Sequence, residues 1–258
     1  MVSAFTTSLL ITFSSRALAA VLLPAVTGVE GVVPSGLVTI GARPTPPPRA
    51  PGHLKAALGL GPGPGPQYVT ITITNKGDGA ISTSHARAPT APPMVSGNAD
   101  PGVIPARGQA EFAVPTGWIG NVAIVPSQFQ ITGDITLLEA NYVIPNGYSY
   151  AVADVDVSFV NGISLPAVCS CDNAVVTGCN KDLWKLGTCP NNNGQGGCVN
   201  PLRSDTSATE AAPFFRPCQH AAWTYVEDGA ADAWGACQSG HITCCVGTEC
   251  APNPKQSP

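Results

Sequence analysis

Charged side chains are scarce in this sequence, and no cluster of basic residues occurs in it. Only 11% of the 258 residues are Asp, Glu, Lys or Arg, with 12 basic against 16 acidic side chains. A surface that binds nucleic acid or an anionic membrane needs a concentrated positive patch. We therefore expect neither partner and favour a neutral or weakly polar one.

Cysteine is absent from the first 168 residues and abundant afterwards. The ten cysteines are Cys169, Cys171, Cys179, Cys189, Cys198, Cys218, Cys237, Cys244, Cys245 and Cys250. An even number at this density is typical of disulfides made in an oxidising compartment. "CSC" and "TCC" lack the spacing of zinc ligands, and no paired histidines accompany them. We predict disulfides of open connectivity, and neither a metal site nor a cofactor.

The sequence has no apolar run long enough to cross a membrane, and its N-terminus fits a secretory leader. "AFTTSLLITF" and "ALAAVLLPAV" are alternative apolar cores, and "ALA" at 17–19 is a candidate cleavage signal. We predict a signal peptide in residues 1–30, cleaved between 19 and 30, and a secreted, extracellular protein. Asn-x-Ser/Thr is also absent, so N-glycosylation is not expected.

Residues 31–66 contain little that forms a helix or a sheet. "RPTPPPRAP" and "GLGPGPGP" dominate the segment, and proline removes amide donors while glycine adds conformational entropy. The segment is a linker, a disordered arm or sequence from a mispredicted exon, and whether the mature protein contains it stays open.

From residue 67 onward the pattern predicts an all-β fold. The expected strands are 68–74, 109–114, 121–125, 129–133, 135–144 and 148–160. Short alternating segments separated by Pro, Gly or Asn are typical of a sandwich or barrel. Helical signals occur only late, at 207–215 and 219–226. The last expected strand contains "DVDVSFVNG" (154–162), whose polar face carries two aspartates, either as a solvated sheet face or as a binding surface.

Several segments together carry a family resemblance. They are "RGQAEFAVPTGWIGNVAI" (107–124), "TLLEANY" (136–142), "DVSFVNG" (156–162), "GCN" (178–180), "FFRPC" (214–218), "YVED" (225–228) and the cysteine-rich tail. In order and spacing they resemble the thaumatin-like proteins, above all the cysteine-poorer members found in filamentous fungi. The similarity extends from about Tyr68 to Cys250.

The resemblance implies a thaumatin-like β-sandwich of about eleven strands and a small disulfide-rich loop and helix region. Residues 67–168 would form the sandwich core, 169–250 the disulfide-rich region and 251–258 a flexible tail. A cleft between the two parts is acidic in many members of the family. It binds, and in some members hydrolyses, β-1,3-glucan.

The resemblance also assigns residues to that cleft. Glu139, Asp156 and Asp228 match three of the family's acids, whereas Asn161 stands in place of an aspartate and Asn121 in place of an arginine. Each acid has a simpler alternative: Glu139 and Asp156 as solvated sheet residues, and Asp228 as a turn or helix-end residue. A family cysteine is also missing near Gly77, which implies that Cys250 pairs within the cysteine-rich region.

Glu139 and Asp156 form the only pair of carboxyl groups that we nominate for catalysis. Glycoside hydrolysis needs a protonated carboxyl group and an ionised one. Repulsion within the pair would favour Glu139 as the acid, but the neutral Asn161 weakens that effect. An amide still hydrogen-bonds sugar hydroxyls, so binding tolerates this substitution better than catalysis does.

Three functions follow from these features. The first is a secreted, cell-wall-associated and monomeric protein that binds β-1,3-glucan with little or no hydrolysis. The second is a weak endo-β-1,3-glucanase that uses Glu139 and Asp156. The third is a disulfide-stapled structural, defence-related or effector-like surface protein without cleft activity.

Overall fold

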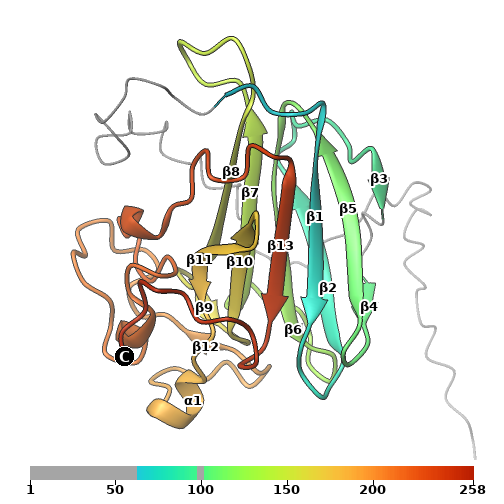
Figure 1. Cartoon of the computed structure of the whole chain (residues 1–258). Helices are drawn as coiled ribbons and strands as arrows, with labels where there is room; N and C mark the ends of the chain where they lie inside the picture. The colour runs from blue at the N-terminus through green and yellow to red at the C-terminus, as the bar shows by residue number, and fades with distance from the viewer. Residues whose placement is uncertain (1–62, 98–101) are drawn as a thin grey trace, which may run out of the picture. The chain divides into compact units, whose positions relative to one another are not determined.

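Two large sheets form the framework of the protein (Figure 1). The computed structural model describes residues 63–97 and 102–258, so the predicted signal peptide and residues 31–62 of the predicted arm lie outside the described residues. The six-stranded sheet contains, in spatial order, β11 (Ala174–Cys179), β10 (Ala167–Cys171), β13 (His241–Val246), β1 (Tyr68–Asn75), β5 (Gln109–Pro115) and β3 (Ser96–Gly97). The five-stranded sheet contains β4 (Gly102–Ile104), β2 (Ile81–Arg87), β6 (Trp118–Pro126), β7 (Thr136–Val143) and β8 (Val152–Ser158). A separate ribbon pairs β9 (Gly162–Ile163) with β12 (Cys198–Val199).

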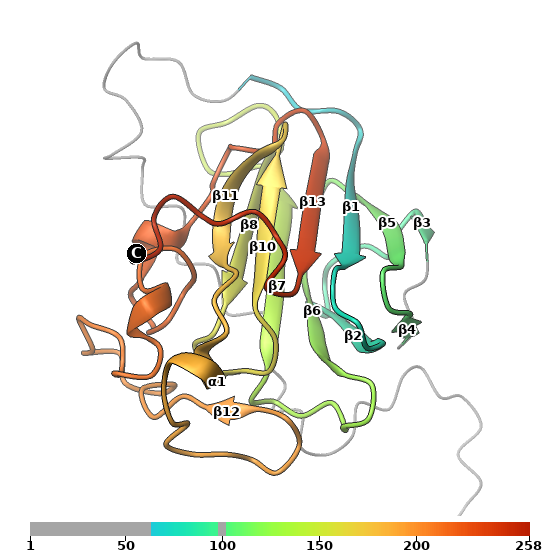
Figure 2. The ribbon, with the colours of Figure 1, turned by 60° about the horizontal axis from the view of Figure 1, so that its bottom comes forward.

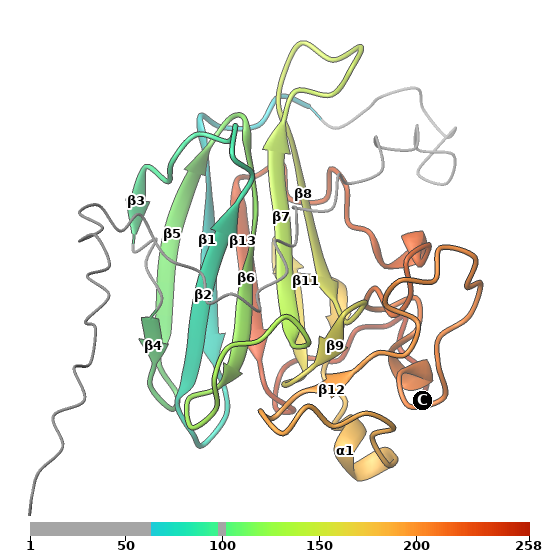
Figure 3. The ribbon, with the colours of Figure 1, turned by 180° about the vertical axis from the view of Figure 1, so that it is seen from behind.

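The two large sheets pack face to face, as Figures 1 and 3 show from opposite sides. The longer strands supply alternate apolar side chains to the core between the sheets. This core includes Ile71, Ile73, Phe112, Val122, Ile124, Val155 and Val157. The predicted all-β class is therefore confirmed, and the two sheets together contain eleven strands.

Most of the expected strands are present, but the one at 129–133 is wrong. The chain turns there, and the Phe129 amide donates to the Pro126 carbonyl at 2.9 Å. Phe129 and Ile131 instead pack against a small apolar cluster on the outer face of the five-stranded sheet. The cluster consists of Ala123, Val125, Ile135 and Leu137. Burial of two apolar side chains thus explains the alternation that suggested a strand.

Helical structure in the described part of the chain is limited to three short turns. They are α1 (Leu183–Leu186), the 3-10 turn η1 (Arg216–Cys218) and the 3-10 turn η2 (Gly229–Ala231). The helical signals at 207–215 and 219–226 were therefore wrong. The backbone of Trp223 pairs with the end of β8 instead. Its amide donates to the Val157 carbonyl at 2.9 Å, and its carbonyl accepts from the Phe159 amide at 2.7 Å. Tertiary pairing overrides the local helix propensity of the alanines there.

Five disulfides join all ten cysteines. The bonds are Cys169–Cys244, Cys171–Cys237, Cys179–Cys218, Cys189–Cys198 and Cys245–Cys250. Cys250 pairs within the cysteine-rich region, as expected. Such a framework belongs in an oxidising, extracellular type of environment. Within the described ranges no helix has the length and apolar character needed to cross a membrane.

The cysteine-rich region is not separate from the sandwich. Its strands β10, β11 and β13 belong to the six-stranded sheet, and β13 lies parallel to β1 in the middle of that sheet. The remaining loops gather on one side of the sandwich, next to β8 and β11 (Figures 1 and 2). The predicted boundary at residue 168 therefore falls inside β10.

An ion-pair cluster lies where the ends of β1 and β13 meet. Gly77, near which the resemblance places a family cysteine, lies close to Gly247 after β13. Arg107 binds Asp78 at 2.6 Å and also the carboxylate of Glu249. The bonds from Arg107 hold the pKa of Glu249 below its ordinary value. The ion pairs of Arg107 thus connect the segment after β1 with the segment after β13.

Candidate functional site

Three of the predicted site residues form a row across neighbouring strands. Asn121 of β6 is in register with Glu139 of β7, and Glu139 is in register with Asp156 of β8. Residues directly opposite each other in an antiparallel pair share a face, with Cβ atoms roughly 4.5 to 5.5 Å apart. We call Asn121, Glu139 and Asp156 the polar row. It lies on the outer face of the sheet, because the alternate residues Val155 and Val157 enter the core.

The members of the polar row differ in their access to solvent. Asn121 is 3% exposed and Asp156 is 9% exposed, whereas Glu139 is only partly buried. The Asn121 Nδ2 atom is buried and donates no hydrogen bond within the described residues. Glu139 is therefore the member best placed to touch a ligand, with Asp156 and Asn121 on either side of it.

A further acid extends the polar face of β8. Asp154 is 2% exposed and stands opposite Asn141 of β7, whose Nδ2 donates to Asp154 Oδ2 at 3.1 Å. The carboxyl group of Asp232, just after η2, lies close enough to Asp154 for a hydrogen bond when one of the two is protonated. Burial, followed by the charge of Asp232 and this hydrogen bond, holds the pKa of Asp154 well above its ordinary value. No sequence signal identified Asp232, because its position depends on the docking of a remote loop.

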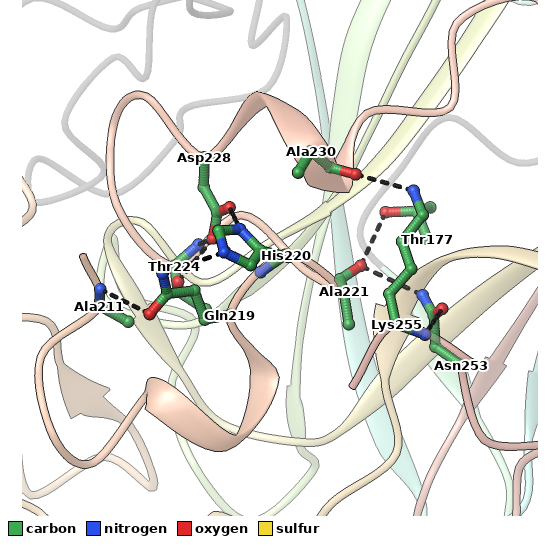
Figure 4. A network of polar contacts seen from close by, with 10 residues as sticks. All are labelled: Thr177, Ala211, Gln219, His220, Ala221, Thr224, Asp228, Ala230, Asn253 and Lys255. Atoms are coloured by element: carbon green, nitrogen blue, oxygen red, sulfur yellow. Dashed lines mark hydrogen bonds and ion pairs between the residues drawn. The ribbon is translucent and has the colours of Figure 1, made fainter. Parts of the chain in front are cut away.

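Asp228 is held within its own loop (Figure 4). Its carboxylate is 1% exposed and accepts from Thr224 Oγ1 at 2.7 Å and from the amides of Thr224 and His220 at 3.3 and 3.2 Å. His220 Nδ1 lies 2.9 Å from the other carboxylate oxygen. Through these four contacts the Asp228 carboxylate holds residues 220–228 in place. The geometry favours the alternative in which Asp228 is a turn residue.

His220 lies in the same loop as Asp228, and nothing in the sequence indicated its role. Its φ of 68° is in the left-handed region, which is costly for a residue with a side chain. The amide and ring contacts to Asp228 offset that cost. Gln219 Nε2 lies 3.3 Å from His220 Nε2, and Gln219 Oε1 accepts from the Ala211 amide at 3.1 Å (Figure 4). The loop is therefore fixed by polar contacts on both sides of the imidazole.

Asn161 lies just beyond β8 and outside the polar row. Its backbone carbonyl accepts from the Asn200 amide at 3.0 Å. Asn200 also donates through Nδ2 to the carbonyls of Phe159 and Thr224, at 3.0 and 2.7 Å. The backbone at Asn161 is thus part of the connection between β8 and the cysteine-rich loops, and its side chain is half-buried.

Comparison with known proteins assigns no family to this chain. Neither the protein-family models nor the curated proteins match it. The thaumatin-like resemblance therefore remains a hypothesis drawn from the residues. What the structure adds is the placement of Asn121, Glu139 and Asp156 side by side on one face.

Proposed function

We propose that this protein is a secreted, thaumatin-like protein that binds cell-wall β-1,3-glucan through the polar row, with little or no hydrolysis. The observation that supports this proposal is the register of Asn121, Glu139 and Asp156 across three adjacent strands. A carboxylate accepts hydrogen bonds from sugar hydroxyls, and an amide both donates and accepts them. The choice of β-1,3-glucan follows from the family resemblance, and secretion follows from the leader and the five disulfides.

Burial favours binding over hydrolysis. In a glycosidase both carboxyl groups act directly on the scissile bond, so both must reach the sugar. Asp156 is only 9% exposed, whereas Glu139 is more accessible. One accessible carboxylate is enough to bind a sugar hydroxyl, but it does not supply both an acid and a nucleophile. The adjacency of Glu139 and Asp156 keeps a weak endo-β-1,3-glucanase as the second candidate, because retaining enzymes place their carboxyl groups about 5 Å apart.

The test is a pull-down of purified, oxidised protein on insoluble β-1,3-glucan, with chitin and cellulose as controls. A reducing-sugar assay on the same glucan follows. Glu139→Gln removes the more accessible carboxylate of the polar row and should weaken binding about tenfold, as expected for a hydrogen bond to a charged group. Glu111→Gln is the matched control, because Glu111 is an exposed strand carboxylate on the other sheet.

The three outcomes separate the three functions. Selective binding without sugar release, weakened by Glu139→Gln alone, supports the proposal. Sugar release that disappears in Glu139→Gln would replace it with the glucanase. Failure to bind β-1,3-glucan above the two control polymers would overturn both and leave the disulfide-stapled surface protein.

A further inference from the structure

Two carboxyl groups meet in a buried position beside the polar row. Asp154 Oδ1 and Asp232 Oδ1 are both inaccessible to solvent, and neither accepts a hydrogen bond from a side-chain donor of the described residues. Their side chains nevertheless lie in hydrogen-bonding contact with each other. Two ionised carboxylates have only acceptors and repel at this range. The contact becomes favourable when one of them carries a proton.

The surroundings show which group holds the proton. Asp154 is fully buried on β8, and the Asn141 amide and the Val155 backbone N–H oppose its protonation only weakly. Asp232 is less buried and lies near the ammonium group of Lys255, which donates to the Ala230 carbonyl at 2.7 Å (Figure 4). Burial therefore favours the neutral form of Asp154, whereas Lys255 places a positive charge near Asp232.

Among the residues that the structure describes, no cation acts on Asp154. Along the same face of the sheet, the next ionisable residues are Glu139 on β7 and Asp156 on β8, both of them acids. In the loop after Cys218, Asp228 adds a further negative charge near Lys255. An ionised Asp154 would add another negative charge to this acidic surface.

The Asp154–Asp232 contact is one of several that hold residues 229–238 against β8. The Gly235 amide donates to the Ala153 carbonyl at 2.8 Å, and the Ala153 amide donates to Gln238 Oε1 at 2.6 Å. The disulfide Cys171–Cys237 anchors the end of the segment to β10. Asp232 lies on the side away from this disulfide, where only non-covalent contacts hold η2.

We propose that Asp154 and Asp232 share one proton, and that this proton fastens η2 to β8 as an acid-dependent latch. Loss of the proton places two negative charges in contact and releases residues 229–235 from the sheet. Because Asp154 binds its proton more tightly in the folded chain, its contribution to stability is complete below the pKa of an unfolded aspartate. The contribution disappears as the pH rises through the folded value. This latch does not depend on the identity of any polysaccharide.

The test compares wild type with Asp154→Asn in thermal unfolding from pH 4 to pH 9. Asparagine has the shape of a protonated aspartate, and its Nδ2 donates to Asp232 without a titrating proton. We expect the wild type to lose stability relative to Asp154→Asn as the pH rises. Asp232→Asn offers the same replacement from the other side of the contact. Asp205→Asn is the control, because Asp205 is an exposed loop residue whose pKa is lowered by bonds from Ser207.

Hydrogen exchange at the Gly235 amide measures the release of the loop directly. Above the pKa of the pair, the opening equilibrium should rise about tenfold for each pH unit after correction for intrinsic exchange. In Asp154→Asn it should stay constant. Infrared spectra should show a protonated carboxyl band in the wild type that Asp154→Asn lacks. Equal pH profiles for the wild type and both asparagine variants, with no such band, would overturn the latch.

Discussion

The carboxylate of Asp228 organises the loop that follows Cys218, and this role predicts a loss of stability rather than of binding. Asp228→Ala leaves the His220 and Thr224 donors without their acceptor in a buried site. We expect the free energy of unfolding to fall by about 2 to 4 kcal/mol. Glu227→Ala, at the exposed neighbouring position, should change it by less than about 0.5 kcal/mol. Denaturant titration measures both.

The same Asp228→Ala variant tests the role that the resemblance assigned to this residue. If Asp228 is a turn residue, the folded fraction should bind β-1,3-glucan as the wild type does. A large loss of binding with unchanged stability would instead return Asp228 to the binding surface.

His85 should make the folded protein less stable at acidic pH, whereas Asp154 should make it less stable as the pH rises. Its ring packs edge-on against Phe112 with centroids 4.8 Å apart, and burial lowers its pKa to about 4. In the unfolded chain His85 is protonated as the pH falls through 6.5, whereas in the folded chain it is protonated only near pH 4. Stability should fall by about 3 kcal/mol as the pH drops from 6.5 to 4.

Replacing His85 with Phe should remove this loss of stability at acidic pH. Denaturant titrations of wild type and His85→Phe at pH 7 and pH 4.5 measure the effect. The difference between the two proteins should change with pH. A constant difference would show that the imidazole titrates equally in the folded and unfolded chains.

At the scale of single elements, the sequence predicts the strands that alternate cleanly and misses those that do not. β1 alternates buried apolar residues with more exposed polar ones, and β7 places Leu138 and Tyr142 in the core with Glu139 and Asn141 on its other face; the sequence predicts both strands. β2 reads "ISTSHAR", where Thr83 and His85 occupy inward positions that apolar residues usually hold. β10 and β13 are rich in cysteine, which we assigned to loops. Their strand character comes from long-range pairing: β13 pairs with β1, about 170 residues earlier in the chain, and β10 pairs with β13, about 70 to 80 residues later.

The polar row could be predicted in part for the same reason. The alternation of β8 places Asp156 opposite the core, but only the register with β7 and β6 brings Glu139 and Asn121 beside it. That register was available only through the family resemblance. Asp232 had no sequence signal, because its loop is brought to the sheet by a disulfide to β10 and by hydrogen bonds that Gly235 and the Gln238 side chain make with Ala153 of β8.

Gly178 marks a position in β11 where the backbone tolerates no side chain. Its φ is 98°, and an added Cβ would lie 2.3 Å from the Ala167 carbonyl oxygen. Gly178→Ala should therefore destabilise the protein by about 2 kcal/mol or more, the cost of left-handed backbone and a clash with a neighbouring strand. Gly229→Ala is the control, because no atom lies within 4 Å of its added Cβ. Equal unfolding midpoints for the two variants would contradict this assignment.

At the scale of the whole molecule, the disulfides differ in how much of the chain they close. Cys169–Cys244 joins residues 75 positions apart and links β10 to β13, where the two cysteines stand directly opposite each other. Cys245–Cys250 joins residues only 5 positions apart. Restriction of the unfolded chain grows with loop length, so the first bond should contribute about 4 to 5 kcal/mol and the second about 2 kcal/mol.

Double alanine variants of each pair measure this difference. Removing Cys169–Cys244 should also free β13 from β10 and so loosen the centre of the six-stranded sheet, which β1 shares. Protease should then cut both the cysteine-rich loops and the strands next to β13, whereas loss of Cys245–Cys250 should expose only residues near the C-terminus. If cleavage after loss of Cys169–Cys244 stayed within the loops, the disulfide-rich region would be mechanically separate from the sandwich, despite the strands they share.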